Sequence, residues 1–270
     1  YGIDRWGDKY FSINSLGNIS ITPNRESKKK VDLFKLVKEI KSREINTPLI
    51  IRFNDILKDR ITELNNSFSK AIKNYDYKNI YKGVFPIKCN QQKNVLKKII
   101  EYGNQWDFGL EVGSKSELLI GLSILENQNS LLICNGYKDK NYIETAILAR
   151  KIGKQPIIVI EQRDEVRRII AAVKNLKATP ILGIRSKLSS KSSGRWGESV
   201  GDNSKFGLSI PEIMQTIKEL KEANLINEMK LLHFHIGSQI SDISVIKDAL
   251  QEASQIFVEL CKLGAPMKYI

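Results

Sequence analysis

From Pro48 onward, short apolar runs alternate with longer segments in which apolar residues recur at helical spacing. In residues 164–176, for example, the apolar positions follow the i, i+3, i+4, i+7 pattern of an amphipathic helix. Continuous apolar runs between helices are typical of parallel strands that are buried on both faces. The predicted strands are 49–53, 83–88, 108–112, 131–134, 156–160, 180–184 and 231–236, and the predicted helices are 55–75, 92–102, 115–126, 141–152, 164–176, 211–223 and 243–262.

Strand–helix units repeat six times after residue 80, and a further strand is predicted to start near Pro266. An open doubly wound sheet usually carries a glycine-rich nucleotide turn after its first strand, and the sequence shows none there. We therefore predict an α/β fold, a (β/α)8 barrel of the TIM type that is truncated after about six units. In such a barrel, functional residues collect at the carboxyl ends of the strands.

The first part of the chain follows a different pattern. Short β-type runs at 10–13 and 19–21 flank a hairpin signal, and residues 31–41 have the spacing of an amphipathic helix. So small a β element cannot bury a core alone. We predict an N-terminal β segment with a linker helix over 1–46, and an incomplete α/β barrel, without a C-terminal β domain, over 47–270.

Composition narrows the functional classes. The 270 residues are 41% hydrophobic and 27% charged, which is ordinary for a soluble globular protein. The net charge of +13 could indicate nucleic-acid binding, but the lysines are scattered and no recognition motif accompanies them. The three cysteines and two histidines do not have the spacing of a zinc site. With no apolar run of 18 residues, a cytoplasmic protein without a membrane segment is expected. The chain starts at Tyr1 and ends on a strand-like run, so we expect a piece of a longer protein.

The stretch 81–92, YKGVFPIKCNQQ, is the first candidate for chemistry. It reads as an apolar strand that ends on Lys88. A lysine in that place is poorly solvated, and desolvation favours the neutral amine that forms Schiff bases. The alternative is that Lys88 is only the first solvated residue after a strand, as most lysines in such places are.

Other predicted strand ends carry polar residues as well. Because side chains alternate along a strand, His233 and His235 are predicted to point the same way. The turn Gly237-Ser238 then offers N–H groups and a hydroxyl at a predicted helix start, which is a candidate anion site. An isolated strand histidine is more often a core residue. An amine, a planar ring and an anion site together are what a pyridine-phosphate aldehyde needs. The strand-end residues are Lys88, Glu111, Asn135, Glu161, Arg185, His233 and His235.

Several motifs carry a family resemblance. Residues 83–92, GVFPIKCNQQ, follow a G-V-(F/Y)-P-I-K-x-N-Q-Q pattern, and the chain also contains GLEVGSKSEL, ICNGYKD, SGRWGESVGDNSKFGL and LHFHIGSQI. With these and its opening YGIDRWGDKYFSIN, the chain resembles the alanine-racemase-like, fold-type III pyridoxal-phosphate enzymes. Within that group it is most similar to the biosynthetic arginine decarboxylases.

The resemblance implies roles for individual residues. Lys88 matches the Schiff-base lysine, and His235 matches the histidine that stacks on the cofactor ring. Ser238, with Gly237, matches part of the phosphate cup. The implied catalytic residues are Lys88, His235 and Glu111, and the implied cofactor-binding residues are Lys88, His235, Gly237, Ser238 and Arg185, with no metal ligand visible.

The resemblance also implies an activity, the decarboxylation of L-arginine to agmatine and CO2 in polyamine (putrescine and spermidine) biosynthesis. Pyridoxal 5'-phosphate would be the cofactor, magnesium a second one, and a homo-oligomer (dimer or tetramer) the assembly. The alternatives are another decarboxylase of this fold, acting on ornithine, diaminopimelate or carboxynorspermidine, and a non-catalytic barrel that only binds the cofactor. The family's glycine-rich phosphate loop and catalytic cysteine are expected beyond Ile270, so residues 1–270 alone are predicted to be inactive. The long polar loop 186–204 is predicted to be a mobile lid.

Overall fold

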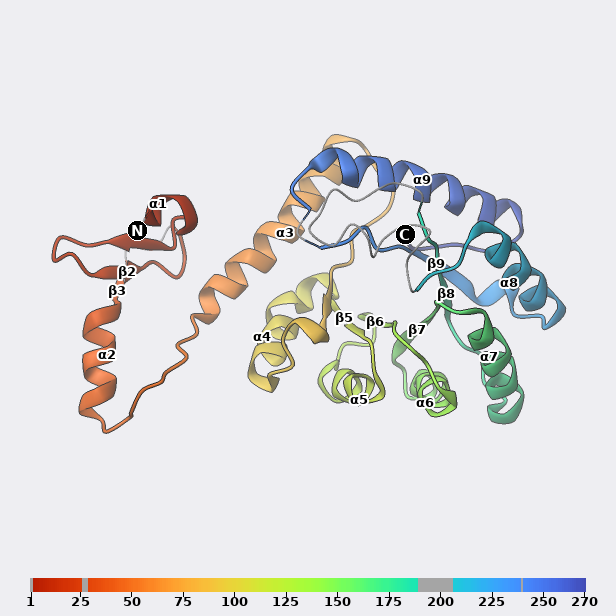
Figure 1. Ribbon diagram of the computed structural model, residues 1–270, viewed down its shortest axis with the longest axis horizontal. Coiled ribbons are helices and arrows are strands. Elements are labelled where there is room, and N and C mark those ends of the chain that lie inside the picture. The colour runs from red at the N-terminus through yellow and green to blue at the C-terminus, as the bar shows by residue number, and fades with distance from the viewer. Residues whose placement is uncertain (1, 26–28, 189–205, 239) are drawn as a thin grey trace. The chain divides into compact units, whose positions relative to one another are not determined.

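The computed structural model describes residues 2–25, 29–188, 206–238 and 240–270 (Figure 1). These residues form two compact units. The first comprises Tyr1–Tyr81 with Lys97–Trp106, and the second comprises Lys82–Leu96 with Asp107–Ile270. The division into domains at residue 46 that we predicted from the sequence stays a prediction.

The first unit is built on a small antiparallel sheet with the order β1-β2-β3. The predicted hairpin is confirmed, since β1 pairs with β2 and the Asn14 side chain accepts the turn amides of Leu16 and Asn18 at 3.0 Å. Asp32 caps the predicted amphipathic helix by accepting a hydrogen bond from the Lys35 amide. The elements are α1 (Ile3–Trp6), β1 (Phe11–Ile13), β2 (Ile19–Ile21), β3 (Val31–Asp32), α2 (Leu33–Ser42) and α3 (Asn54–Asn74).

The predicted strand at 49–53 is wrong. These residues have no regular structure, and they lead directly into α3, which was predicted within one residue of its observed start. An apolar run becomes a strand only when a neighbouring strand satisfies its backbone N–H and C=O groups. Ile50 instead remains 79% exposed.

The second unit is a six-stranded parallel sheet with the order β4-β5-β6-β7-β8-β9 (Figure 1). Each strand pairs with the next one along the chain, as in a barrel, whereas a doubly wound sheet reverses its order at a switch point. A parallel bridge from Leu231 to Tyr269 places the end of the chain beside β9, where a seventh strand was predicted. The predicted truncated barrel is therefore confirmed.

The helices α4 to α9 accompany these strands, and α5 to α8 follow one another along one side of the sheet (Figure 1). Most predicted boundaries are correct within two residues. The strands are β4 (Val84–Pro86), β5 (Gly109–Val112), β6 (Leu131–Cys134), β7 (Gln155–Ile160), β8 (Leu182–Arg185) and β9 (Met229–His233). The helices are α4 (Lys93–Gly103), which both units share, and α5 (Lys115–Ile124), α6 (Lys140–Lys151), α7 (Arg163–Leu176), α8 (Ile210–Glu222) and α9 (Ile243–Lys262).

The strands are buried on both faces, as their unbroken apolar runs predicted. All four residues of β6 are buried, and one face of the sheet packs into a cluster of Leu131, Ile133, Ile157, Val159 and Leu231. Burying one such side chain stabilises the fold by about 1.5–3 kcal/mol.

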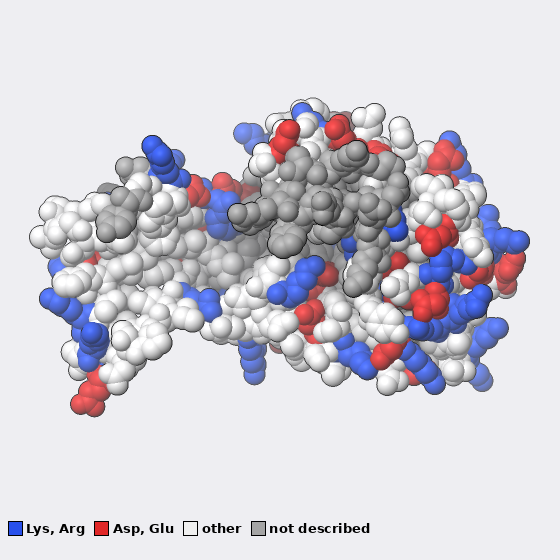
Figure 2. Space-filling view, viewed as in Figure 1, with Lys and Arg blue, Asp and Glu red and all other residues white. Residues whose placement is uncertain are grey.

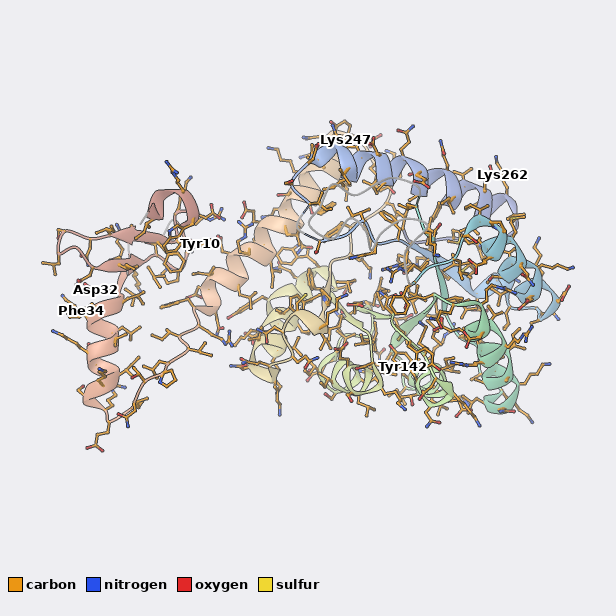
Figure 3. The ribbon with its side chains drawn as sticks, in the orientation of Figure 1. Tyr10, Asp32, Phe34, Tyr142, Lys247 and Lys262 are labelled. Atoms are coloured by element: carbon orange, nitrogen blue, oxygen red, sulfur yellow. The ribbon has the colours of Figure 1, made fainter. Side chains whose placement is uncertain are left out.

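On the helix side, α5 lies close to the sheet because it carries Gly121. A Cβ atom there would lie 2.9 Å from a Leu132 methyl carbon. Tyr142 of α6 is buried, and its hydroxyl donates to the Val112 carbonyl at 3.0 Å (Figure 3). These contacts fix the carboxyl ends of β5 and β6.

The charged surface is mixed in sign. On the face shown in Figure 2, basic and acidic side chains are interspersed over the barrel unit, and pairs such as Arg168–Asp164 at 2.5 Å join them. None of the described helices combines the length and the apolar character that a membrane crossing requires.

Candidate active site at the strand ends

Lys88 lies on a single turn of 3-10 helix (Ile87–Cys89), and β4 ends before it, at Pro86. The predicted strand that runs through Lys88 is therefore wrong. Only Val84 to Pro86 pair with β5, and the Asn90 amide then closes the turn by donating to the Ile87 carbonyl at 3.0 Å. Ile87 is fully buried and anchors the turn, whereas Lys88 is exposed. The predicted burial of this lysine is also wrong.

Glu111 lies on β5 opposite Pro86, so it is next to the turn that carries Lys88. Its carboxylate accepts a hydrogen bond from the Asn135 side chain at 3.4 Å. Burial raises the pKa of Glu111, and this effect outweighs the charge of Lys88 and the Asn135 hydrogen bond, which both lower it. The Glu111 carboxyl group therefore binds a proton more readily than an exposed glutamate does.

Asn135 also contacts His233, the last residue of β9, since its amide nitrogen lies 3.3 Å from the ring atom Nε2. Burial and then the charge of Arg185 lower the pKa of His233 to about 3, so this imidazole is neutral at neutral pH. With Asn135 donating to Nε2, the ring proton belongs on Nδ1. That Nδ1 and the Asn135 Oδ1 are buried without a hydrogen-bond partner among the described residues. Such orphaned atoms indicate a place where a ligand or water completes the network.

His235 lies two residues beyond β9, so the predicted strand to residue 236 is also too long. The last paired residues of β8 and β9 are Arg185 and His233. Although the His235 side chain is exposed, partial burial of its ring lowers its pKa, and the charges of Arg185 and Lys88 lower it further. Both cations therefore act electrostatically on this ring, and all three groups belong to the carboxyl ends of the strands.

Arg185 ends β8, where its guanidinium donates to the Glu161 carboxylate at 2.5 Å. The ring of Phe206 lies 5.9 Å from the guanidinium carbon. Glu161 follows β7 directly, so both partners lie at the same edge of the sheet. The structure thus places Arg185 at the barrel mouth, where the sequence predicted it.

The sequence did not reveal the role of Lys138, which is completely buried in the loop between β6 and α6. Its ammonium lies 3.1 Å from Glu165 and 3.6 Å from Glu161, and it donates to the Gly136 carbonyl at 2.5 Å. A loop lysine is normally solvated, so burial was not expected. The sequence does contain one signal for this ion-pair network. Glu161 and Glu165 are spaced i, i+4 after β7, and Lys138 follows the preceding strand β6.

Gly237 and Ser238 follow His235 without opening a helix, so that prediction is wrong. The helix α9 begins only at Ile243, and the Asp242 carboxylate caps it by accepting from the Ser244 amide at 2.8 Å. Gly237 has a φ of 106°, which favours glycine at this bend, and Ser238 is exposed. The candidate anion site therefore consists of a turn and a hydroxyl without a helix end.

Most of the predicted lid at 186–204 lies outside the described residues. Its first residues are tied to the barrel edge, because the Ser186 amide donates to the His233 carbonyl at 2.9 Å and the Lys187 amide to the Leu208 carbonyl at 3.0 Å.

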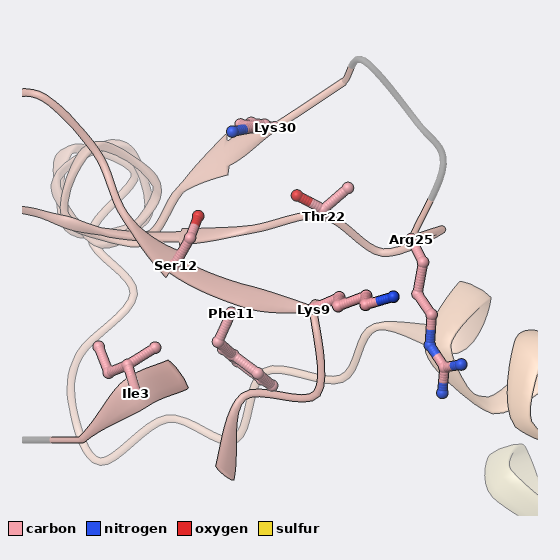
Figure 4. Close-up of a pocket in the computed structure, with 7 residues that line it drawn as sticks. All are labelled: Ile3, Lys9, Phe11, Ser12, Thr22, Arg25 and Lys30. Carbon is pink, nitrogen blue, oxygen red and sulfur yellow. The ribbon is translucent and has the colours of Figure 1, made fainter. Parts of the chain in front are cut away.

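A pocket of about 350 Å³ lies in the N-terminal unit (Figure 4). Arg25, one of its cations, is already paired with Asp8 at 2.8 Å and Glu63 at 2.9 Å. The pocket holds none of the predicted site residues, so the strand ends are the candidate site. Its lining residues are Ile3, Lys9, Phe11, Ser12, Thr22, Arg25 and Lys30.

The strand ends fit a pyridine-phosphate aldehyde in three respects. Among the residues that the structure describes, the Lys88 ammonium has neither a hydrogen bond nor an ion pair, which leaves it open to a ligand. His235 offers a flat ring, and its lowered pKa favours the neutral form. Lys88 and Arg185 supply positive charge for an anionic group. No cluster of three or more histidine, cysteine, aspartate or glutamate side chains that could hold a metal ion occurs in the described part of the chain.

Comparison with known proteins places the chain in a sequence family. The family model of the pyridoxal-dependent decarboxylases, for their pyridoxal binding domain, matches residues 59–270. A curated biosynthetic arginine decarboxylase of Prochlorococcus marinus (strain MIT 9515) is 88% identical over the whole chain. A protein of the same description from Parasynechococcus marenigrum is 58% identical. The chain spans 42% of the length of each of these relatives.

Solved structures show the same similarity. The biosynthetic arginine decarboxylase of Campylobacter jejuni is 34% identical, with a TM-score of 0.87 that covers 98% of this chain and 42% of that one. Diaminopimelate decarboxylase of M. jannaschii has a TM-score of 0.70 at 21% identity, over 96% of this chain and 55% of that one. The second match shows a shared fold only.

Proposed function

Because the chain belongs to the pyridoxal-dependent decarboxylases, through their pyridoxal-binding domain, we propose that it is the cofactor-binding part of an arginine decarboxylase. The proposed reaction converts L-arginine to agmatine and CO2. The bond between the α-carbon and the carboxylate breaks, its electron pair stays on carbon, and a proton from the site replaces the lost CO2. Bound pyridoxal phosphate supplies the electron sink that makes this bond cleavage possible.

One observation carries the proposal: Lys88, Arg185 and His235 all lie at or just beyond the carboxyl ends of parallel strands of one sheet. The charge of Lys88 acts on both Glu111 and His235, and the charge of Arg185 acts on His235 as well. An amine, a planar ring and a second cation therefore lie at the same end of the sheet. That is the set of groups needed to attach an aldehyde, cover its ring and hold its anionic oxygens.

Lys88 is the residue that we propose to attach the cofactor, since its amine is exposed on a turn that the buried Ile87 holds in place. Glu111 then has the role of a proton carrier beside this amine. Its raised pKa makes it a better proton donor and acceptor than an exposed glutamate. The Asn135 hydrogen bond keeps its carboxylate oriented toward the strand ends.

His235 would cover the flat face of the cofactor ring. A neutral imidazole can stack without placing a positive charge against the electron sink, and the lowered pKa of His235 favours this form. Arg185, with the Gly237-Ser238 turn, would hold anionic groups of the cofactor. These roles stay predictions.

The choice of L-arginine rests on similarity, namely 88% identity with a curated arginine decarboxylase over all of this chain. We also propose that the complete protein binds magnesium, forms a homo-oligomer, functions in the cytoplasm and contributes to polyamine biosynthesis.

The test is a substrate panel with the purified full-length protein and added pyridoxal phosphate. Release of CO2 would be measured from L-arginine, ornithine, diaminopimelate and carboxynorspermidine. Agmatine formation from L-arginine alone is the expected result. Preference for another amino acid would identify a different decarboxylase, and cofactor binding without any CO2 release would identify a non-catalytic binding barrel.

A further inference from the structure

Four charged side chains connect three consecutive strand ends beneath the candidate site. Lys138 follows β6, Glu161 follows β7, and Arg185 ends β8, while Glu165 lies in the first turn of α7. Lys138, Glu161 and Glu165 are each at most 2% exposed. Two cations face two carboxylates, so the group is balanced in charge.

Contacts with Glu161 connect Lys138 to Arg185. The Lys138 ammonium lies between one oxygen of Glu165 and Oε2 of Glu161, and Glu165 also accepts the Glu161 backbone amide at 2.9 Å. Oε1 of Glu161 accepts from the Arg185 guanidinium at 2.5 Å. Glu161 is therefore held at its backbone by Glu165, and its Oε1 holds Arg185. Its Oε2 has the 3.6 Å ion pair with Lys138 and no hydrogen-bond partner among the described residues.

The two carboxylates differ in their electrostatic environment. Burial alone would raise the pKa of Glu161, but Lys138 and Arg185 together outweigh it and lower the pKa. Burial also raises the pKa of Glu165, where the charge of Lys138 does not compensate for it. Glu161 is thus firmly ionised, as a permanent partner of Arg185 must be.

A contribution to folding stability does not explain why these four charged side chains are placed together. A buried ion pair is often no more stabilising than apolar residues of the same volume, because desolvation of the charges offsets their attraction. What buried ions provide is a fixed geometry for the groups that they contact. Here the least buried member of the network is Arg185, whose side chain is 16% exposed and whose charge acts on the rings of His233 and His235.

We propose that Lys138 is a positioning residue, which acts through Glu161 to aim the Arg185 guanidinium at an anionic group of the bound cofactor. The inference rests on the proposed function, since it assigns the ligand of Arg185 to pyridoxal phosphate. Lys138 itself is fully buried and does not touch the ligand.

A double-mutant cycle on the full-length protein separates positioning from a general effect on folding. The first variant is Lys138→Met with Glu165→Gln, which removes one charge of each sign and keeps the group balanced. The second is Arg185→Met, and the third combines all these changes. Each protein is stripped of cofactor and titrated with pyridoxal phosphate, and the dissociation constant is measured from protein fluorescence. Lys115→Met, at an exposed lysine that pairs with Asp139 at 2.7 Å, is the matched control.

We expect the dissociation constant to rise about tenfold in Lys138→Met/Glu165→Gln, within the range known for residues that orient a ligand-binding group. Adding Arg185→Met should raise it no further than Arg185→Met alone does, and Lys115→Met should leave it unchanged. Wild-type affinity in the first variant, or losses that add fully in the combined protein, would overturn the proposal.

Glu161→Gln gives a second test that does not depend on the folding of the Lys138 variant. It should also be non-additive with Arg185→Met, and full additivity would again contradict the proposal. Failure of the proposed function looks different. In that case the wild-type protein itself would show no visible absorbance of lysine-bound cofactor, whatever the Lys138 variants do.

Discussion

Two lysines at the strand ends of the same sheet occupy opposite environments. Lys88 lies on an exposed turn after β4, and Lys138 is fully buried after β6 between two glutamates. Both follow a strand directly or nearly so, and both could have been read as candidate nucleophiles. The difference teaches that a reactive lysine needs an accessible amine. A buried lysine in ion pairs instead holds its partner side chains in fixed positions.

The two environments meet at Asn135. Its amide nitrogen lies within 3.4 Å of Glu111, next to Lys88, and within 3.3 Å of His233, which is paired with Arg185 on β8. The Asn135 side chain therefore connects Glu111, beside Lys88, with His233, beside Arg185.

The largest expected effect is the loss of Lys88. Lys88→Ala in the full-length protein should lower decarboxylation by about a thousandfold or more, because it removes the amine that we propose to attach the cofactor. Initial rates of CO2 release and the visible absorbance of the purified protein measure this. Lys115→Ala is the control and should retain both. Activity within tenfold of wild type in Lys88→Ala would show that Lys88 is not the residue that attaches the cofactor.

Removing Lys138 alone, without a compensating change at Glu165, should also lower the stability of the fold. Lys138→Met leaves two buried glutamates with one cation, and breaking a buried ion pair costs about 3–5 kcal/mol. The exposed pair of Lys115 and Asp139 should contribute far less, because solvent screens exposed charges. Thermal unfolding of both single variants beside wild type checks the contrast. Equal melting temperatures for Lys138→Met and Lys115→Met would show that Lys138 is not held as tightly as its contacts indicate.

His233 should make the protein sensitive to acid. Its pKa in the folded state is about 3, below the unfolded value of about 6.5, so the unfolded chain binds a proton first as pH falls through this window. Stability should therefore decrease by about 1–2 kcal/mol between pH 7 and pH 5. The difference in melting temperature between wild type and His233→Gln, followed over this range, isolates the effect. A difference that stays constant with pH would contradict the neutral buried ring.

The smallest expected effect concerns the cofactor ring. His235→Ala should weaken cofactor binding about two- to tenfold, since stacking of aromatic rings contributes about 0.5–1.5 kcal/mol. His233→Ala should instead lower the melting temperature and change the affinity less. Titration of both variants with pyridoxal phosphate measures the ratio, and the reverse order would exchange the two roles.

Much of the barrel could be predicted from the sequence because buried parallel strands have unbroken apolar runs. The runs at 131–134 and 156–160 became β6 and β7 with at most one added residue. The run at 49–53 failed because its apolar character says nothing about a partner strand. Strand ends were the least predictable, since β4 and β9 stop where pairing stops, before Lys88 and His235.

The positions of the candidate residues were easier to predict than their environment. Lys88, Glu111 and His235 come from motifs, Arg185 comes from a predicted strand end, and the structure places all four at or near the carboxyl ends of strands. Their roles stay predictions. The burial of Lys138 was not predictable, because it depends on glutamates that are 23 and 27 positions away in sequence and on the fold that brings them together.

The central claim is that Lys88, and not the buried Lys138, attaches the cofactor. Reduction of the full-length protein with borohydride in the presence of pyridoxal phosphate, followed by peptide mapping by mass spectrometry, tests it directly. The reduced cofactor should be found on the peptide that contains Lys88, and Lys138 and Lys115 should remain unmodified. Modification of Lys138, or of any lysine in place of Lys88, would contradict the account.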